Sequence, residues 1–219
     1  MDLHFEVFWV VWPSLARGTL NSLLLIVTVL ITSTACGLMV AFGLNSRIAW
    51  LRKTFAIWSW AARGIPPLVI LLLVFLGMPQ VGVVLPPFIA ATVGMTLYIS
   101  FYFAEAFKGG FAGIPKEQHQ AIAALSLPRA RAFRRVLFPQ ILPTILPSYF
   151  SRATEIVKGT AIAAAVAFPE LATAAKQSLV YTFRPIEVLA FAAVIYIVMN
   201  GILIWLQAVF EKRSLQHRA

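Results

Sequence analysis

Long apolar tracts separated by short polar segments dominate the sequence. Four tracts reach the roughly 20 residues that an α-helix needs to cross a hydrocarbon layer ~30 Å thick. They lie at about residues 20–44, 54–77, 86–107 and 186–210. A fifth tract, at about 140–168, contains charged residues but is long enough to count as a span. The pattern predicts an all-α integral membrane protein with about five transmembrane helices, in a single domain over residues 1–219.

The composition supports a membrane protein and narrows its chemistry. Apolar residues make up 60% of the chain, against about half in soluble domains. The histidines His4, His119 and His217 are far apart, and Cys36 is the single cysteine. Neither a metal cluster nor an intrachain disulfide is therefore expected. No Ser/His/Asp or Cys/His set is placed for nucleophilic catalysis, so an independent membrane enzyme is not expected either.

Basic residues are distributed unevenly between the two sides of the predicted membrane. The net charge of +10 also occurs in nucleic-acid-binding proteins, but here the cations stand beside apolar tracts, so we expect membrane lipid and no nucleic acid as a partner. Of the 18 Lys and Arg, 12 fall in the first and third connections and the C-terminal tail, and only three fall on the other side. The 12 are Arg47, Arg52, Lys53, Lys108, Lys116, Arg129, Arg131, Arg134, Arg135, Lys212, Arg213 and Arg218. The positive-inside rule then predicts an outside N-terminus, a cytoplasmic C-terminus and a cytoplasmic loop at about 108–135.

The segment 119–147, HQAIAALSLPRARAFRRVLFPQILPTILP, gathers four arginines and four prolines between two apolar tracts. Ala121, Ala124 and Leu125 have the i, i+3, i+4 spacing of one helical face, which predicts a short helix over 117–127 that Pro128 ends. A face of small residues lets another backbone approach closely. The same face and its arginines are also typical of an anchor that lies on lipid headgroups. The spacing alone leaves both interpretations open.

This segment matches part of a known motif. Gln120, Ala121 and Ile122 stand in the places of Glu-Ala-Ala, Ser126 stands in the place of a glycine, and Pro139 ends the pattern as in Ile-x-Leu-Pro. The chain thus resembles the EAA loop of permease subunits from binding-protein-dependent ABC importers. Further motifs resemble the polar amino-acid branch of that family, the histidine, glutamine and arginine type, over about residues 15–213. They are Gly18-Thr19-Leu20, Arg63-Gly64-Ile65-Pro66-Pro67-Leu68, Tyr102-Phe103-Ala104-Glu105, Lys158-Gly159-Thr160, Pro169-Glu170-Leu171, Phe183-Arg184-Pro185, Tyr196 and Glu211-Lys212-Arg213.

The resemblance implies a type I ABC importer permease in a bacterial inner membrane, with the short helix acting as a coupling helix on a cytoplasmic ATPase. The implied partners are a dimer of ATP-binding subunits, a second permease subunit that is a paralogue or a second copy, and a periplasmic or extracellular solute-binding protein. The substrate implied is a polar amino acid or related small zwitterion. The residues implied to couple to the ATPase are Gln120, Ala121, Ile122, Ala124, Leu125, Ser126 and Pro139.

The chain is not expected to hydrolyse ATP itself. A P-loop requires a Gly-Lys-Ser/Thr sequence to hold phosphates, and Gly-Lys does not occur in this chain. We therefore expect no cofactor on this chain, with ATP and Mg²⁺ held by the partner subunit. The alternative function is an ATP-independent channel or carrier for small polar solutes. A carrier would be expected to contain internal inverted repeats, which the sequence does not display.

Ionisable residues within the tracts are candidates for the substrate pathway, because such groups usually face a protein interior or a water-filled path. The candidates are the ionisable Arg63, Glu105, Arg152, Glu155 and Lys158, together with Gly159 and Thr160, which follow Lys158 in the motif that resembles the family. Two of them have a structural alternative. Arg63 precedes Pro66 and Pro67, where the helix must break, so it could bond the freed carbonyls. Glu105 could simply pair with Lys108 at i+3.

Arg152, Glu155 and Gly159 follow one another at steps of three and four on one helical stripe. A neutralising pair between Arg152 and Glu155 is one interpretation. The other is that Arg152 receives the carboxylate of a zwitterion, Glu155 receives its ammonium group, and Gly159 leaves room for it.

Overall fold

The computed structural model describes residues 6–216, and all regular elements in that range are helical. The α-helices are α1 (Val7–Leu44), α2 (Ala49–Gly64), α3 (Pro67–Leu72), α4 (Pro87–Ala112), α5 (Lys116–Ala124), α6 (Arg129–Ala132), α7 (Phe138–Gly159), α8 (Leu171–Thr182) and α9 (Pro185–Gln216). The π-helices are η1 (Leu73–Gly77) and η3 (Phe133–Leu137), and the 3₁₀ helices are η2 (Met78–Val81) and η4 (Thr160–Val166). His4, His217 and Arg218 lie outside the described residues. The predicted all-α fold is confirmed.

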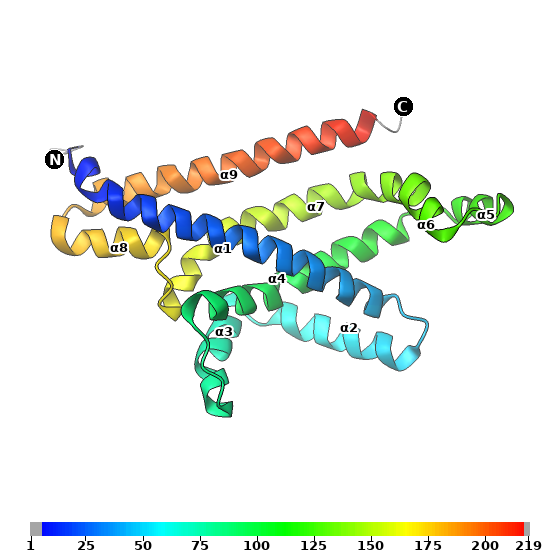
Figure 1. Cartoon of the computed structure of the whole chain (residues 1–219), viewed down its shortest axis with the longest axis horizontal. Coiled ribbons are helices and arrows are strands. Elements are labelled where there is room, and N and C mark those ends of the chain that lie inside the picture. The colour runs from blue at the N-terminus through cyan, green and yellow to red at the C-terminus, as the bar shows by residue number, and fades with distance from the viewer. Residues whose placement is uncertain (1–5, 217–219) are drawn as a thin grey trace.

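Four long helices, α1, α4, α7 and α9, run along the longest axis of the molecule (Figure 1). Within the described residues, three single helices are long and apolar enough to cross a membrane, and two bent helix pairs raise the number to five if each pair counts as one span. The C-terminal ends of α1, α4 and α9 and the short helices α5 and α6 all lie toward one end of the molecule. The connections that carry most of the basic residues therefore meet there.

The prediction that the second tract, 54–77, forms a single helix is wrong. The tract consists of the end of α2 followed by α3 and η1, and the chain bends by 105° at the break between α2 and α3. Ile65 is extended, with φ −91° and ψ 132°, because the ring of the following proline excludes the helical region. The break that the two prolines predict is thus confirmed, but its consequence for the span was missed.

The other tracts differ from the structure mainly at their ends. The first helix begins at Val7 instead of residue 20, since Pro13 and Arg17 interrupt the apolar pattern without interrupting the helix. The charged fifth tract forms α7 and continues through η4 to Val166, close to the predicted 140–168. The tracts at 86–107 and 186–210 lie inside α4 and α9, respectively.

Small residues bring α1 and α4 close together. Ser33, Gly37 and Ala41, four residues apart on α1, are all buried. A Cβ atom added to Gly37 would lie 2.8 Å from the Cβ of Phe103 and 3.0 Å from the carbonyl oxygen of Ser100. In lipid, helix association depends on such close packing, because no hydrophobic effect drives apolar helices together. This contact fixes α4, one side of the site described next.

A buried carboxylate holds α8 against its neighbours. Glu170 caps α8, accepting hydrogen bonds from the backbone N–H groups of Ala172 and Thr173. Its side chain also accepts a hydrogen bond of 2.9 Å from the hydroxyl group of Tyr196 on α9. On the other side, Asn21 of α1 donates to the carbonyl oxygen of Pro169 at 2.7 Å. The start of α8 is thereby bound to both α1 and α9.

Candidate functional site

Polar and charged side chains of α4 and α7 face each other along the molecule. On α4, Tyr98, Tyr102 and Glu105 follow one another at steps of four and three, so they share one face of the helix. On α7, Arg152 and Glu155 lie on the facing side, because the guanidinium carbon of Arg152 is 4.1 Å from the centre of the Tyr102 ring. The two faces together form the candidate pathway.

The first group of charges surrounds Glu105. Its carboxylate lies 3.3 Å from a guanidinium nitrogen of Arg63 and 3.8 Å from the ammonium nitrogen of Lys108. The predicted i, i+3 pair with Lys108 is therefore confirmed. Arg63 also donates from Nε to the carbonyl oxygen of Ser59, and its own carbonyl accepts the Tyr102 hydroxyl at 3.3 Å. Arg63 thus stabilises the broken end of α2 and links it to α4.

The second group is the Arg152–Glu155 pair. One guanidinium nitrogen of Arg152 lies 2.7 and 2.8 Å from the two carboxylate oxygens of Glu155. Both side chains remain about one-third exposed, at 34% and 38%. Because charged groups are costly in lipid, a pair this exposed within a predicted span must contact either water or another protein chain.

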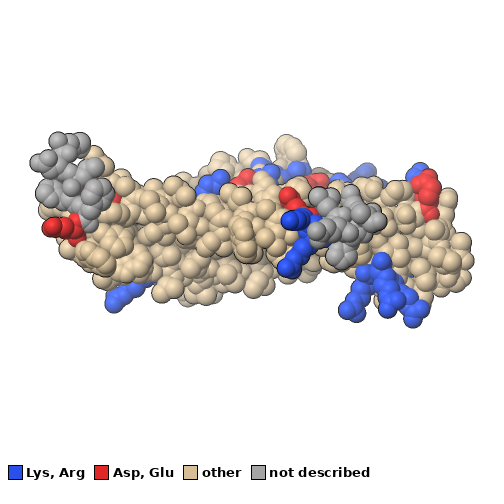
Figure 2. Space-filling view, turned by 90° about the horizontal axis from the view of Figure 1, so that it is seen from above, with Lys and Arg blue, Asp and Glu red and all other residues tan. Residues whose placement is uncertain are grey.

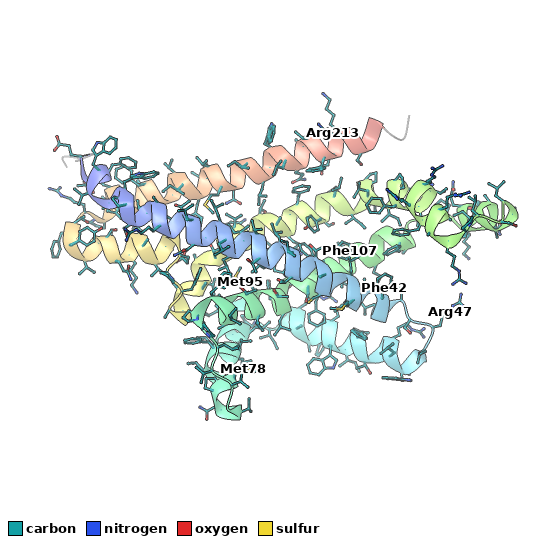
Figure 3. All side chains as sticks on the ribbon, in the orientation of Figure 1. Phe42, Arg47, Met78, Met95, Phe107 and Arg213 are labelled. Atoms are coloured by element: carbon teal, nitrogen blue, oxygen red, sulfur yellow. The ribbon has the colours of Figure 1, made fainter. Side chains whose placement is uncertain are left out.

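A pocket of about 270 Å³ lies next to this pair, between α3, α4, α7 and η4. Glu155, Lys158 and Gly159 line it together with apolar and aromatic residues that include Met95 and Tyr98. Figure 3 shows Met95 on α4 near the middle of the molecule. A Cβ atom on Gly159 would lie 3.4 Å from the terminal methyl of Met95, so this glycine keeps that part of the pocket open. The pocket can therefore offer a carboxylate and an ammonium group to one small ligand.

Not every predicted pathway residue reaches the pocket. Arg63, Glu105 and Arg152 do not line it, although the Tyr102 hydroxyl donates to the carbonyl oxygen of Arg63 and the Tyr102 ring lies against Arg152. Thr160 is fully buried, and its hydroxyl donates to the carbonyl oxygen of Val157. Sequence reasoning missed Tyr98 and Met95 as site residues. Their spacing to Tyr102 and Glu105 along one helical face was the available signal.

The short helix predicted over 117–127 corresponds to α5, which extends beyond the long helices at one end of the molecule (Figure 1). Ala121, Ala124 and Leu125 are exposed, so the predicted face is available to a partner. Gln120 is also exposed, and Ile122 is half-buried.

The end of this helix differs from the prediction. The helix stops at Ala124, and Pro128 instead precedes the start of α6. The chain reverses because Ser126 adopts a left-handed φ of 48°. The N–H groups of Ser126 and Leu127 donate to the carbonyls of Ala123 and Ile122, which is a Schellman motif. Ser126 therefore adopts the conformation that glycine would adopt with less strain.

Pro139 lies apart from α5. It is half-buried in the first turn of α7 and lines a hollow of about 520 Å³ with Gly110, Gly113 and Gln140. Among the sequence-predicted coupling residues, the structure brings together those of α5 and its turn, and it places Pro139 on the span that follows.

Comparison with known proteins decides the family. The model of the family described as binding-protein-dependent transport system inner membrane component matches residues 33–216, most of the chain. The chain belongs to this family. It is thus a permease subunit of an ABC importer, and the resemblance that the sequence motifs suggested is confirmed.

Individual relatives agree with this assignment. The octopine transport system permease protein of Rhizobium meliloti is 33% identical over 192 residues, which cover 82% of this chain and 78% of that protein. The histidine/lysine/arginine/ornithine transport system permease protein of Escherichia coli is 27% identical and covers 87% of this chain and 90% of that protein.

Solved structures agree as well. An amino acid ABC transporter crystallised with histidines matches with a TM-score of 0.87 and 28% identity, covering 97% of this chain and 100% of that chain. An inward-facing methionine ABC transporter matches with a TM-score of 0.75 at 18% identity, covering 97% and 99%. The second match shows the shared fold alone. The fold of the described residues is therefore that of an ABC importer permease.

Proposed function

We propose that this permease subunit carries a polar amino acid or related small zwitterion into a bacterial cell, with ATP hydrolysed on a separate partner subunit. The names of relatives support the substrate class, because they include transport systems for octopine and for histidine, lysine, arginine and ornithine. ATP and Mg²⁺ are held by that partner, and this chain needs no cofactor of its own.

The pocket beside the Arg152–Glu155 pair is the observation that carries the proposal. Glu155 and Lys158 both line it, so it presents opposite charges a short distance apart on α7. A zwitterion carries one carboxylate and one ammonium group, and charge-assisted hydrogen bonds would fix both. Glu155 binds the ammonium group and Lys158 binds the carboxylate. Arg152 holds Glu155 when no substrate is bound and attracts the substrate carboxylate as it approaches.

The exposed face of α5 supports ATP-driven operation. A helix that projects from the spans, with alanines outward, fits a cleft on a partner and moves the spans when the partner closes. Gln120, Ala121, Ile122, Ala124 and Leu125 contact the ATPase, and the Ser126 turn connects this contact to α6 and α7.

The partners follow from the same surfaces. Two ATP-binding subunits meet α5 in the cytoplasm, and a second permease, either a paralogue or a second copy, covers the open charged face of α4 and α7. A periplasmic or extracellular solute-binding protein delivers substrate at the opposite end. The chain therefore lies in the inner membrane with its N-terminus outside and its C-terminus in the cytoplasm.

Reconstitution tests the proposal. The permease is placed in liposomes with its ATPase, and uptake of radiolabelled polar amino acids is measured with the binding protein outside and ATP inside. We expect Lys158→Gln to raise the substrate concentration for half-maximal uptake at least tenfold, since it removes one charged hydrogen bond, worth roughly 1.5–3 kcal/mol. Lys176→Gln, which removes an exposed lysine of α8 outside the pocket, is the matched control.

Two results would contradict the proposal. Equal uptake by wild type and Lys158→Gln at every concentration would exclude the pocket as the substrate site. Uptake at the same rate without ATP would favour the alternative, a channel or carrier that works without a partner ATPase.

A further inference from the structure

A second pocket, of about 260 Å³, lies near the end of the molecule that carries α5 and α6, between α1, α4 and α7. Its inner wall is formed by the buried side chains of Phe107, Ile141 and Leu146. Among the described residues, two hydroxyls line it, those of Thr34 and Tyr149, and they bond to each other at 2.9 Å. A pocket without free polar groups does not hold ordered water, and a volume of about 150 Å³ already admits benzene. This pocket therefore fits a hydrocarbon chain.

The rim of the pocket is built by a π-helix. Leu38, Phe133 and Phe138 line the pocket and are all exposed, so it opens to the surface of the chain. In the π-turn η3, the N–H group of Phe138 donates to the carbonyl oxygen of Phe133, five residues earlier. This wider turn brings the two rings to 5.9 Å, whereas an α-helix would separate positions five apart by more than a quarter of a turn. Such π-turns are frequent at functional sites.

Arginines flank the rim residue Phe133 along the chain. Arg134 and Arg135 follow Phe133 in the same π-turn, and Arg129 and Arg131 precede it on α6. All four are exposed, and none pairs with a carboxylate of the described residues within 4.0 Å. Figure 2 shows Lys and Arg side chains gathered over this half of the molecule. The surface is thus complementary to an anion attached to a hydrocarbon chain.

We propose that this pocket is a binding site for an anionic phospholipid, with one acyl chain between α1, α4 and α7 and the phosphate on Arg134 and Arg135. A membrane supplies such a molecule with its headgroup at the end of the spans, where the arginines lie. The bound lipid packs against α7 at its junction with the α5–α6 segment. It therefore stabilises the connection through which motion of α5 reaches the pathway.

Native mass spectrometry of the full-length chain in detergent tests this site. The chain is titrated with phosphatidylglycerol and with phosphatidylcholine of the same acyl chains, and bound lipid is counted. We expect phosphatidylglycerol to bind about 25-fold more tightly, from two arginines at roughly fivefold each. Arg134→Gln with Arg135→Gln should abolish this preference, whereas Arg47→Gln with Arg52→Gln, an exposed pair around the start of α2, should keep it.

A separate variant tests the part of the site that binds the acyl chain. Leu38→Trp places an indole in the mouth of the pocket. It should weaken the binding of both lipids about tenfold, because the acyl chain would lose the burial of roughly two methylenes. Met39→Trp, at the next and more exposed position of α1, is the matched control. Circular dichroism checks that both variants remain folded.

Three outcomes would overturn the proposal. They are equal binding of the two lipids by wild type, loss of preference in the Arg47 and Arg52 control pair as well, and unchanged binding in a folded Leu38→Trp. Because none of these measurements involves transport, failure here leaves the proposed function untouched, and the reverse also holds.

Discussion

Arg152 shows how a side chain can be both structural and functional. Its guanidinium binds Glu155 and lies over the ring of Tyr102, so it has two partners before any substrate arrives. The sequence placed Arg152 and Glu155 on one stripe but left open whether they neutralise each other or bind a ligand. Their geometry fits the first interpretation in the unliganded chain, and the position of Glu155 in the pocket wall fits the second.

A charge swap separates these interpretations. If the pair is only structural, Arg152→Glu combined with Glu155→Arg should restore the folding and transport that either single change impairs. If Glu155 binds substrate, the swap should restore assembly but not uptake, because the carboxylate leaves the pocket wall. The measurements are co-purification of the complex and uptake in liposomes. Unchanged uptake in Glu155→Gln would exclude the binding role altogether.

Ser126 carries strain that a glycine would remove. A left-handed conformation costs a residue with a Cβ roughly 1 kcal/mol or more, so Ser126→Gly should stabilise the turn after α5. We expect the amide of Leu127 to exchange hydrogen about fivefold more slowly in this variant. Ser151→Gly, at an exposed helical position of α7, is the control and should destabilise its helix. Faster exchange at Leu127 in Ser126→Gly would contradict the argument.

The hydrophobic pattern predicted which segments are helices better than it predicted their ends and bends. Apolar length was sufficient for α4 and α9, because each is one uninterrupted helix. It failed for the tract at 54–77, because hydropathy averages over Pro66 while the backbone bends there by 105°. The contacts of Arg63 with Glu105 and of Arg152 with Tyr102 were not predictable. They join helices whose relative rotation depends on tertiary packing, which the sequence of one segment does not contain.

The exposed face of α5 predicts which positions, when occupied by a large side chain, prevent coupling to the ATPase. Ala121→Trp or Ala124→Trp should leave membrane insertion intact, since α5 lies outside the spans, but should abolish ATP-driven uptake and release the ATPase during purification. Ala123→Trp is the matched control, because Ala123 is exposed on the opposite side of the same helix. Normal uptake in both test variants would show that α5 is not the coupling helix.

The contact between α1 and α4 predicts a packing defect. Gly37→Ala places a methyl group 2.8 Å from the Cβ of Phe103, and overpacking of this kind typically costs about 1–3 kcal/mol. Gly201→Ala adds the same atom to α9 where nothing lies within 4 Å, so the helix propensity of alanine should leave its stability equal or higher. Thermal unfolding in detergent measures both. A melting temperature in Gly37→Ala as high as in wild type would mean that the helices are not so closely packed.

The assembled transporter must cover surfaces that this chain leaves open. The charges of α4 and α7 are partly exposed in the isolated chain, and lipid would be a costly environment for them. A second permease on this face would enclose the pathway between two subunits, and the arginine-rich end would meet both the ATPase and anionic headgroups.

The orientation of the chain in the membrane is the remaining expectation that follows from the uneven distribution of basic residues. Arg47 and Arg213 lie toward the end that carries α5 (Figure 3), and the positive-inside rule places that end in the cytoplasm. In a Cys36→Ser background, His119→Cys on α5 should resist a membrane-impermeant thiol reagent in intact cells and react after permeabilisation. Gln80→Cys, exposed in η2, should react in both conditions, because the same rule predicts that the connection after the second tract lies outside. Labelling of His119→Cys in intact cells would show that the chain has the opposite orientation. In that orientation α5 could not contact a cytoplasmic ATPase.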